Sequence, residues 1–182
     1  VVGLSPWWAG VVFAIGSFWD GFCDPVIGAL ADRTRTRWGR FRPWVVGMMP
    51  VVAIALAAVF YKPALAGAQL VTYALITHLL LRTAYTSASI PYLSLSARIT
   101  HDGRDRSTIA GYRMQFAALA GLFVALGYPF AAERLGGGDD AHGYFLAAVI
   151  FGCLSLPFVA LSMWAARDPA DPRETGPSMG LI

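Results

Sequence analysis

Residues 6–44 read PWWAGVVFAIGSFWDGFCDPVIGALADRTRTRWGRFRPW. Residues 6–30 are mainly apolar, and the following segment, residues 31–42, contains five arginines, the last of which is Arg42. An apolar run of about 20 residues is long enough to cross the hydrocarbon core of a bilayer as a helix. This stretch therefore predicts a membrane-spanning helix that ends in a basic loop.

The rest of the chain repeats the same pattern of a long apolar stretch followed by a short polar loop. Together with the first stretch, it predicts an all-α polytopic membrane protein with five transmembrane helices over residues 6–30, 44–61, 69–95, 108–131 and 144–166. A transmembrane barrel would instead show segments of about ten residues with alternating hydrophobicity. We therefore expect a helical bundle over residues 1–167, followed by a polar, proline-rich tail or linker over residues 168–182.

The overall composition supports a membrane protein. Of the 182 residues, 57% are hydrophobic and 14% are charged, and the mean hydropathy is +0.56. Soluble domains carry about 25% charged residues. The composition therefore argues against a soluble enzyme, a disordered chain and a nucleic-acid-binding protein. Cys23 and Cys153 lie in apolar stretches without metal-ligand spacing, so neither a disulfide nor a zinc site is predicted.

The basic residues are distributed unequally between the two predicted sides of the membrane. One side carries only Lys62 and Arg134. The other side carries ten arginines: Arg33, Arg35, Arg37, Arg40, Arg42, Arg98, Arg104, Arg106, Arg167 and Arg173. The positive-inside rule places the side with ten arginines in the cytoplasm. We therefore expect an inner (plasma) membrane protein with residue 1 outside and residue 182 in the cytoplasm.

Four ionisable residues lie inside the predicted spans: Asp20, Asp24, Arg82 and Arg113, with His78 nearby. A charged side chain at the centre of a span costs roughly 2.5 to 3.5 kcal/mol, so it normally has a partner or a function. Asp20 and Asp24 are four residues apart and share one helix face. They repel each other unless a cation or a cationic side chain approaches. The pair therefore predicts either a cation site or an interhelical ion pair with Arg82 or Arg113, and the two interpretations can coexist.

The third predicted span is rich in hydroxyl groups, which come from Thr83, Tyr85, Thr86, Ser87 and Ser89. Tyr85 and Ser89 share a helix face. Such a mixture of hydroxyl groups and an aromatic ring suits a polyhydroxylated ligand. Hydrogen bonding between neighbouring helices is an equally good interpretation.

Residues 19–44 follow the pattern WDxxxDPxxGxxxDRTxTRWGRxRPW, which is long and specific. It resembles the signature of the glycoside–pentoside–hexuronide:cation symporters of the major facilitator superfamily, the melibiose permease-like group. Residues 90–95, 105–107 and 112–114 resemble the same family further along the chain. The resemblance maps the five spans onto the second to sixth helices of a twelve-helix transporter. Because the chain also begins with Val1, we expect a piece of a longer protein that has a first helix and a C-terminal half.

The resemblance implies a cation site formed by Asp20 and Asp24, which Thr86 joins through its hydroxyl group. The coupling cation is expected to be Na⁺, H⁺ or Li⁺, and no cofactor is implied. In the same way, the resemblance places Tyr85, Ser89 and Arg113 in the substrate pocket.

Two pocket positions depart from melibiose permease. It has an aspartate at the position of Ser89 and a tryptophan at the position of Leu93. Galactoside specificity is therefore not implied, and another sugar, a uronide or a less sugar-like solute fits as well. A related branch of the superfamily transports lysophospholipids with sodium.

The end of the first predicted span and the basic loop behind it contain the residues that the resemblance assigns to a cytoplasmic gating motif: Gly28, Asp32, Arg33, Gly39 and Arg40. Gly28 is expected to allow close packing of helices, and the charged residues are expected to form a latch that breaks during transport. The alternative is that the arginines only set the orientation and contact anionic lipid headgroups.

The sequence as a whole predicts a symporter of sugars or glycosides that works by alternating access, with membrane lipids around it and no nucleic-acid partner. A non-transporting scaffold is a second interpretation. An intramembrane enzyme would need a catalyst such as His78 or His101, but neither has the spacing of a known catalytic motif. We therefore do not expect an enzyme.

Overall fold

The computed structural model describes residues 3–98 and 102–165. It contains the helices α1 (Pro6–Arg33), α2 (Arg42–Phe60), α3 (Ala68–Arg98), α4 (Gly103–Gly136) and α5 (Asp140–Ala165). The predicted all-α architecture with five helices is therefore confirmed. The predicted tail over residues 168–182 lies outside the described residues, as does His101.

Several helix ends lie outside the predicted apolar runs, and local residues explain some of these ends. Pro43 lies in the first turn of α2, where a missing N–H costs no hydrogen bond. The side chain of Asp102 caps α4 by accepting a hydrogen bond from the N–H of Arg104 at 2.8 Å. Gly137, with φ of 56°, ends the same helix in the left-handed conformation.

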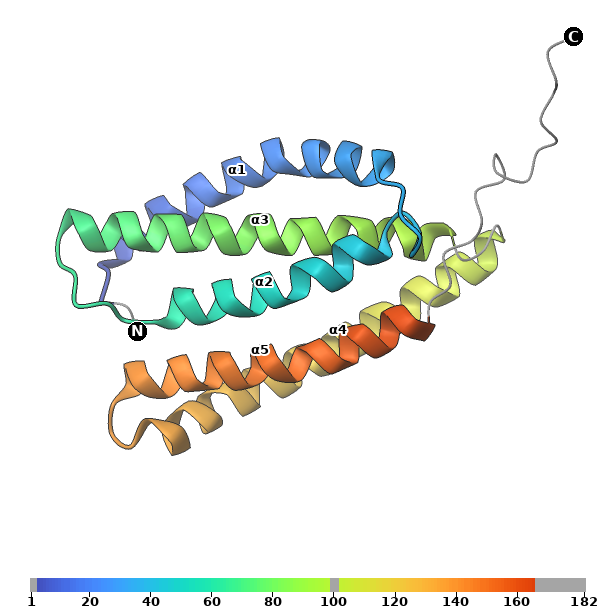
Figure 1. Cartoon of the computed structure of the whole chain (residues 1–182). Helices are drawn as coiled ribbons and strands as arrows, with labels where there is room; N and C mark the ends of the chain where they lie inside the picture. The colour runs from blue at the N-terminus through green and yellow to red at the C-terminus, as the bar shows by residue number, and fades with distance from the viewer. Residues whose placement is uncertain (1–2, 99–101, 166–182) are drawn as a thin grey trace, which may run out of the picture.

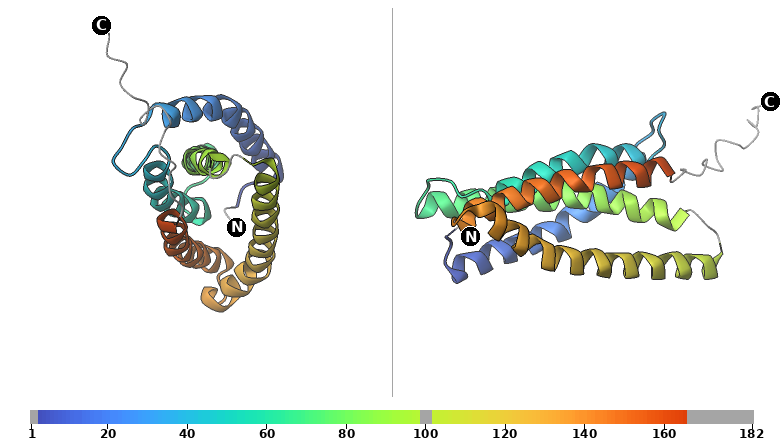
Figure 2. Two further views of the ribbon diagram at one scale, coloured as in Figure 1. Left: turned by 90° about the vertical axis from the view of Figure 1, so that its right-hand side faces the viewer. Right: turned by 90° about the horizontal axis from the view of Figure 1, so that it is seen from below.

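The helices run alternately up and down in one bundle (Figure 1). α3 packs against both α1 and α2, α2 also packs against α5, and α4 packs against α5. In the end-on view of Figure 2, α3 lies inside the arc formed by the other helices. The loop between α1 and α2 lies at the same end of the bundle as the end of α3 and the start of α4 (Figure 1). The arginine-rich segments therefore share one end, as expected from the charge distribution.

Four helices, α1, α2, α4 and α5, are long and apolar enough to cross a membrane. α3 has 31 residues, which is also enough in length, but its composition is more polar. The polar residues Thr77, Thr86 and Ser87 are buried inside the bundle. α3 is therefore an inner helix, and several of its hydroxyl groups face other helices.

Many large apolar side chains lie on the outside of the bundle, and many of its buried residues are alanines. Phe18, Phe116 and Leu126 are exposed, whereas Ala55, Ala147 and Ala148 are fully buried. In water such a surface would be unfavourable, but lipid tails solvate it, and small residues let helices approach closely. The distribution is that of a protein embedded in a bilayer.

Candidate functional site

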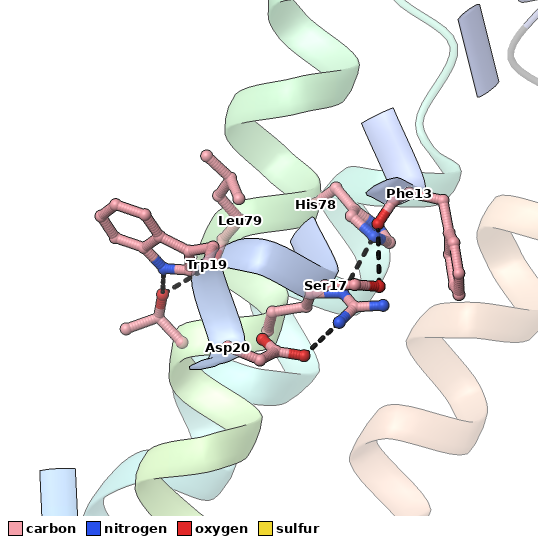
Figure 3. Close-up of polar contacts among 8 residues, drawn as sticks. Phe13, Ser17, Trp19, Asp20, His78 and Leu79 are labelled. Atoms are coloured by element: carbon pink, nitrogen blue, oxygen red, sulfur yellow. Dashed lines mark hydrogen bonds and ion pairs between the residues drawn. The ribbon is translucent and has the colours of Figure 1, made fainter. Parts of the chain in front are cut away.

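An ion pair joins α1 to α3 in the middle of the bundle. Nη1 of Arg82 contacts Oδ2 of Asp20, and the two side chains are 20% and 31% exposed (Figure 3). This contact is the interhelical ion pair that the sequence offered as one of two interpretations of the acidic pair. Because only one carboxylate oxygen is used, the contact does not exclude the second interpretation.

The guanidinium group of Arg82 is fixed by two further contacts. Its Nε donates a hydrogen bond to Nε2 of His78 at 3.1 Å. The guanidinium carbon also lies 5.1 Å from the ring centroid of Phe13, within the range of a cation–π interaction. Since Nε2 of His78 accepts this hydrogen bond, the ring proton of a neutral His78 is on Nδ1. Arg82 is therefore held in one orientation toward Asp20.

Gly16 makes room for this cluster. A Cβ atom at Gly16 would lie 2.9 Å from Nε of Arg82 and 2.9 Å from Cδ2 of His78. A Cβ atom does not approach other side-chain atoms so closely, so any larger residue here would require Arg82 or His78 to shift. The sequence reasoning missed this residue. The feature of the sequence that could have revealed it is its position, because Gly16 lies four residues before Asp20 and therefore on the same helix face.

A hydrogen bond next to the ion pair fixes the register of the two helices. Nε1 of Trp19 donates to Oγ1 of Thr83 at 2.9 Å, and Oγ1 of Thr83 donates in turn to the carbonyl of Leu79 at 2.8 Å (Figure 3). α1 and α3 are thus linked at two successive positions of each helix. A slip of one helix along the other would break both links.

A cavity of about 470 Å³ lies beside the ion pair and is lined by Asp20, Arg82, Tyr85 and Thr86 with three apolar residues of α2 and α3. Oδ1 of Asp20 is buried and has no hydrogen-bond partner among the described residues. Two of the predicted cation ligands, Asp20 and Thr86, therefore line one cavity. Asp24, one turn further along α1, is exposed.

A second cavity of about 380 Å³ lies between α2, α3 and α5. Tyr85 and Ser89 line it together with Tyr92, Ser162 and mainly apolar residues. Tyr85 lines both cavities, so it stands between the acidic cavity and the more apolar one. Two of the predicted substrate residues are therefore brought together. Arg113, the third, is exposed on α4, and α4 contributes no lining residue to either cavity.

The predicted gating residues lie at the arginine-rich end of the bundle. Gly39 has φ of 95° and closes a tight turn, in which its N–H donates to the carbonyl of Thr36 at 3.0 Å. Arg40 follows it, with its guanidinium carbon 6.0 Å from the ring centroid of Phe41. Asp32 and Arg33 are exposed at the end of α1. The turn fixes the backbone of the loop between α1 and α2, and the latch stays a prediction.

The expected role of Gly28 in close helix packing stays a prediction, because the described residues do not crowd this position. A Cβ atom at Gly28 would meet only Cγ2 of Ile90, at 4.0 Å, which is an ordinary van der Waals distance. α1 therefore has room for a methyl group at this position. The close approach of α1 to α3 occurs twelve residues earlier, at Gly16.

Comparison with known proteins settles the family. The family described as MFS/sugar transport protein matches residues 1–179. The chain belongs to this family. This chain is an integral membrane protein, consistent with the four described helices that are long and apolar enough to cross a membrane. The predicted resemblance to cation symporters of the major facilitator superfamily is thereby confirmed.

Three relatives illustrate the range of the family. The chain is 34% identical to the putative glycoside/cation symporter YagG of Escherichia coli over 92% of its own length and 36% of the relative. It is 36% identical to the uncharacterized symporter YnaJ of Bacillus subtilis, over 85% of its length and 34% of the relative. It is 29% identical to the sodium-dependent lysophosphatidylcholine symporter 1 of Xenopus tropicalis, over 65% and 23%. The chain thus spans about a third of the length of the bacterial relatives.

Proposed function

We propose that this chain is part of a cation-coupled symporter that moves sugars or glycosides by alternating access. The observation that carries the proposal is the site of Asp20, an intramembrane carboxylate that lines a cavity and has one buried oxygen to which none of the described residues donates a hydrogen bond. An intramembrane carboxylate with open ligand capacity suits a transported cation. The printed names of the relatives, which include a putative glycoside/cation symporter, support the same activity.

The cation in this proposal binds to Oδ1 of Asp20, to the carboxylate of Asp24 and to the hydroxyl group of Thr86. Na⁺, Li⁺ and H⁺ are the candidates, because carboxylate and hydroxyl oxygens serve all three. A bound cation reduces the repulsion between the two carboxylates. If it also favours solute binding nearby, the solute must raise the cation affinity by the same factor.

The solute in this proposal occupies the cavity that Tyr85 and Ser89 line. The hydroxyl groups of Tyr85, Ser89, Tyr92 and Ser162 are available to hydrogen-bond a sugar. Tyr85 lines both cavities, so in this proposal its side chain contacts the solute and lies next to the bound cation. Alternating access then moves a site near the middle of the membrane from one side to the other.

The proposal includes a longer protein, whose first helix and C-terminal half cover exposed faces of this helical bundle. α4 has 34 residues, of which only Ala132 is buried among the described residues. Arg113 is exposed on this helix, and exposure to lipid would cost it roughly 2.5 to 3.5 kcal/mol. Cover by further helices of the same protein removes that cost. The arginine-rich end faces the cytoplasm of a plasma (inner) membrane in this arrangement, with residue 1 outside.

A second candidate is a sodium-coupled transporter of lysophospholipids or similar amphiphiles. The lining of the second cavity favours it, because Val45, Met49, Val52 and Phe158 offer an apolar surface to an acyl chain. The similarity to the lysophosphatidylcholine symporter of Xenopus tropicalis supports it as well. The two candidates share the cation site and differ in the solute.

The test is uptake into proteoliposomes that contain the full-length transporter with this segment. A panel of radiolabelled glycosides and lysophosphatidylcholine is offered with an inward Na⁺, Li⁺ or H⁺ gradient, and with choline as the reference. We expect one solute class to accumulate with a cation gradient. Solute binding without gradient-driven uptake would indicate a scaffold and overturn the proposal.

A variant of Asp24 tests the site itself. Asp24→Cys is expected to insert into the membrane normally and to lose the cation stimulation of uptake. Asp140→Cys is the matched control, because it removes a carboxylate at the start of α5, at the opposite end of the bundle from the basic loop. Unchanged stimulation in Asp24→Cys would show that the cation binds elsewhere.

A further inference from the structure

The proposed cation site comprises three charged side chains, two of them negative and one positive. Asp20 and Asp24 lie on one face of α1, and Arg82 reaches Asp20 from α3. A guanidinium group stays protonated in proteins, so its charge is permanent. With both carboxylates ionised, the formal charge of the cluster is therefore −1 and not −2.

Contacts on several sides hold the side chain of Arg82 in this position. Its Nε is hydrogen-bonded to His78, its guanidinium group lies over Phe13, and Gly16 supplies the space. All of these residues lie on the two helices that carry the ion pair. The positive charge thus stays beside Asp20 whether or not a mobile cation is present.

The ion pair leaves room for a mobile cation. Nη1 of Arg82 contacts Oδ2 of Asp20, whereas Oδ1 is buried without a hydrogen-bond partner among the described residues. A bidentate arginine would occupy both oxygens of the carboxylate and close the site. Buried polar atoms normally have a partner, so the free oxygen itself points to a missing ligand.

We propose that Arg82 is a tethered cation that sets the charge of the site to −1, so that a single sodium ion neutralises it. The inference rests on the proposed function, because it names the ion and the charge balance of the same site. Arg82 acts as a positioning and specificity-determining residue: it neutralises one carboxylate permanently and lowers the affinity for the mobile ion. The lower affinity lets sodium leave the site after each transport step.

Charge arithmetic gives the expected effects of substitution. Arg82→Gln leaves a site of −2, and removal of a unit positive charge close to the bound ion is expected to lower the half-saturating sodium concentration by about tenfold or more. Asp20→Asn leaves a site of zero net charge and is expected to lose the sodium response. The double variant Asp20→Asn with Arg82→Gln returns the charge to −1 and is expected to regain it.

The experiment is a sodium titration of the purified full-length protein in detergent, with choline chloride keeping the ionic strength constant. The readout is the unfolding temperature, which rises when an ion binds the folded state, so it does not depend on the solute. Arg82→Lys keeps the charge and is expected to stay within about threefold of the unmodified protein. Arg134→Gln is the matched control, because it removes the same charge near the end of α4 without touching the cluster.

Three outcomes decide the matter. If Arg82→Gln folds and keeps the sodium half-saturation of the unmodified protein, Arg82 is only a structural brace and the inference is overturned. If Arg82→Gln does not fold, the double variant decides, since it removes both charges and leaves no buried charge unpaired; failure to regain the response overturns the inference. If the unmodified protein shows no sodium response but accumulates solute with a proton gradient, the inference fails and the proposed function stands.

Discussion

A methyl group added at Gly16 tests the packing on which the charged cluster depends. In Gly16→Ala, the new Cβ would lie 2.9 Å from Nε of Arg82, 2.9 Å from Cδ2 of His78 and 3.0 Å from Cδ of Arg82. Optimal contacts between heavy atoms are about 3.5 to 4.0 Å. Either α1 moves away from α3, or Arg82 turns away from Asp20. Both responses weaken the link between the helices.

The size of the effect follows from two opposing terms. Overpacking of a well-filled site costs about 1 to 3 kcal/mol. Replacing glycine by alanine inside a helix returns about 1 kcal/mol. The same gain applies at Gly10 and Gly21 of α1, where an added Cβ meets nothing within 4 Å. Gly16→Ala is therefore expected to be about 1 to 3 kcal/mol less stable than Gly10→Ala or Gly21→Ala.

The assay is equilibrium unfolding of the full-length protein in mixed micelles, followed by far-ultraviolet circular dichroism. All three alanine variants gain the same helix propensity. The difference in unfolding free energy between Gly16→Ala and the other two therefore measures the cost of the contact with Arg82 and His78. Equal stability of the three variants would refute the close approach of α1 and α3 at Gly16. It would also remove the argument that Arg82 is held in place.

Three further predictions concern the frame around the site. Gly143→Ala is expected to separate α4 from α5 and to lower the yield of folded protein severely. The reason is that its Cβ would lie 2.1 Å from the carbonyl oxygen of Ala132, a backbone atom that cannot turn aside. The yield is measured by size-exclusion chromatography of detergent extracts. Gly39→Ala is expected to cost about 1 to 2 kcal/mol in an unfolding titration, since φ of 95° is unfavourable for a residue with a Cβ. Trp44→Phe is expected to cost about 1 kcal/mol in the same titration, because it removes the hydrogen bond from Nε1 of Trp44 to Oγ1 of Thr34 at 2.8 Å.

The helices could be predicted from the sequence because lipid imposes a simple rule on it. Every span needs a continuous apolar run, so the run over residues 108–131 locates α4 without any knowledge of its partners. The true ends at Gly103 and Gly136 lie outside that run. They depend on the cap at Asp102 and on the left-handed Gly137, and helix caps lie beyond the apolar core.

The partners of the charged residues could not be predicted in the same way. Arg82 and Arg113 both stand inside apolar stretches, and each was a candidate partner for Asp20. The choice depends on which helices are neighbours, and α1 packs against α3. Spacing within one helix says nothing about this. Gly16 was missed for the same reason, because the space it leaves matters only when Arg82 and His78 come from another helix.

The ion pair also explains why two interpretations of the acidic pair need not compete. A brace between helices requires only that Arg82 and Asp20 touch, and one carboxylate oxygen suffices for this. A cation site requires oxygen atoms that no donor occupies, and Oδ1 of the same carboxylate meets that requirement within the part of the chain that the structure describes. One side chain can therefore hold α1 against α3 and bind an ion in turn. Because both tasks share Asp20, ion binding and the packing of these two helices must influence each other, and a rearrangement of α1 against α3 would alter the affinity for the ion.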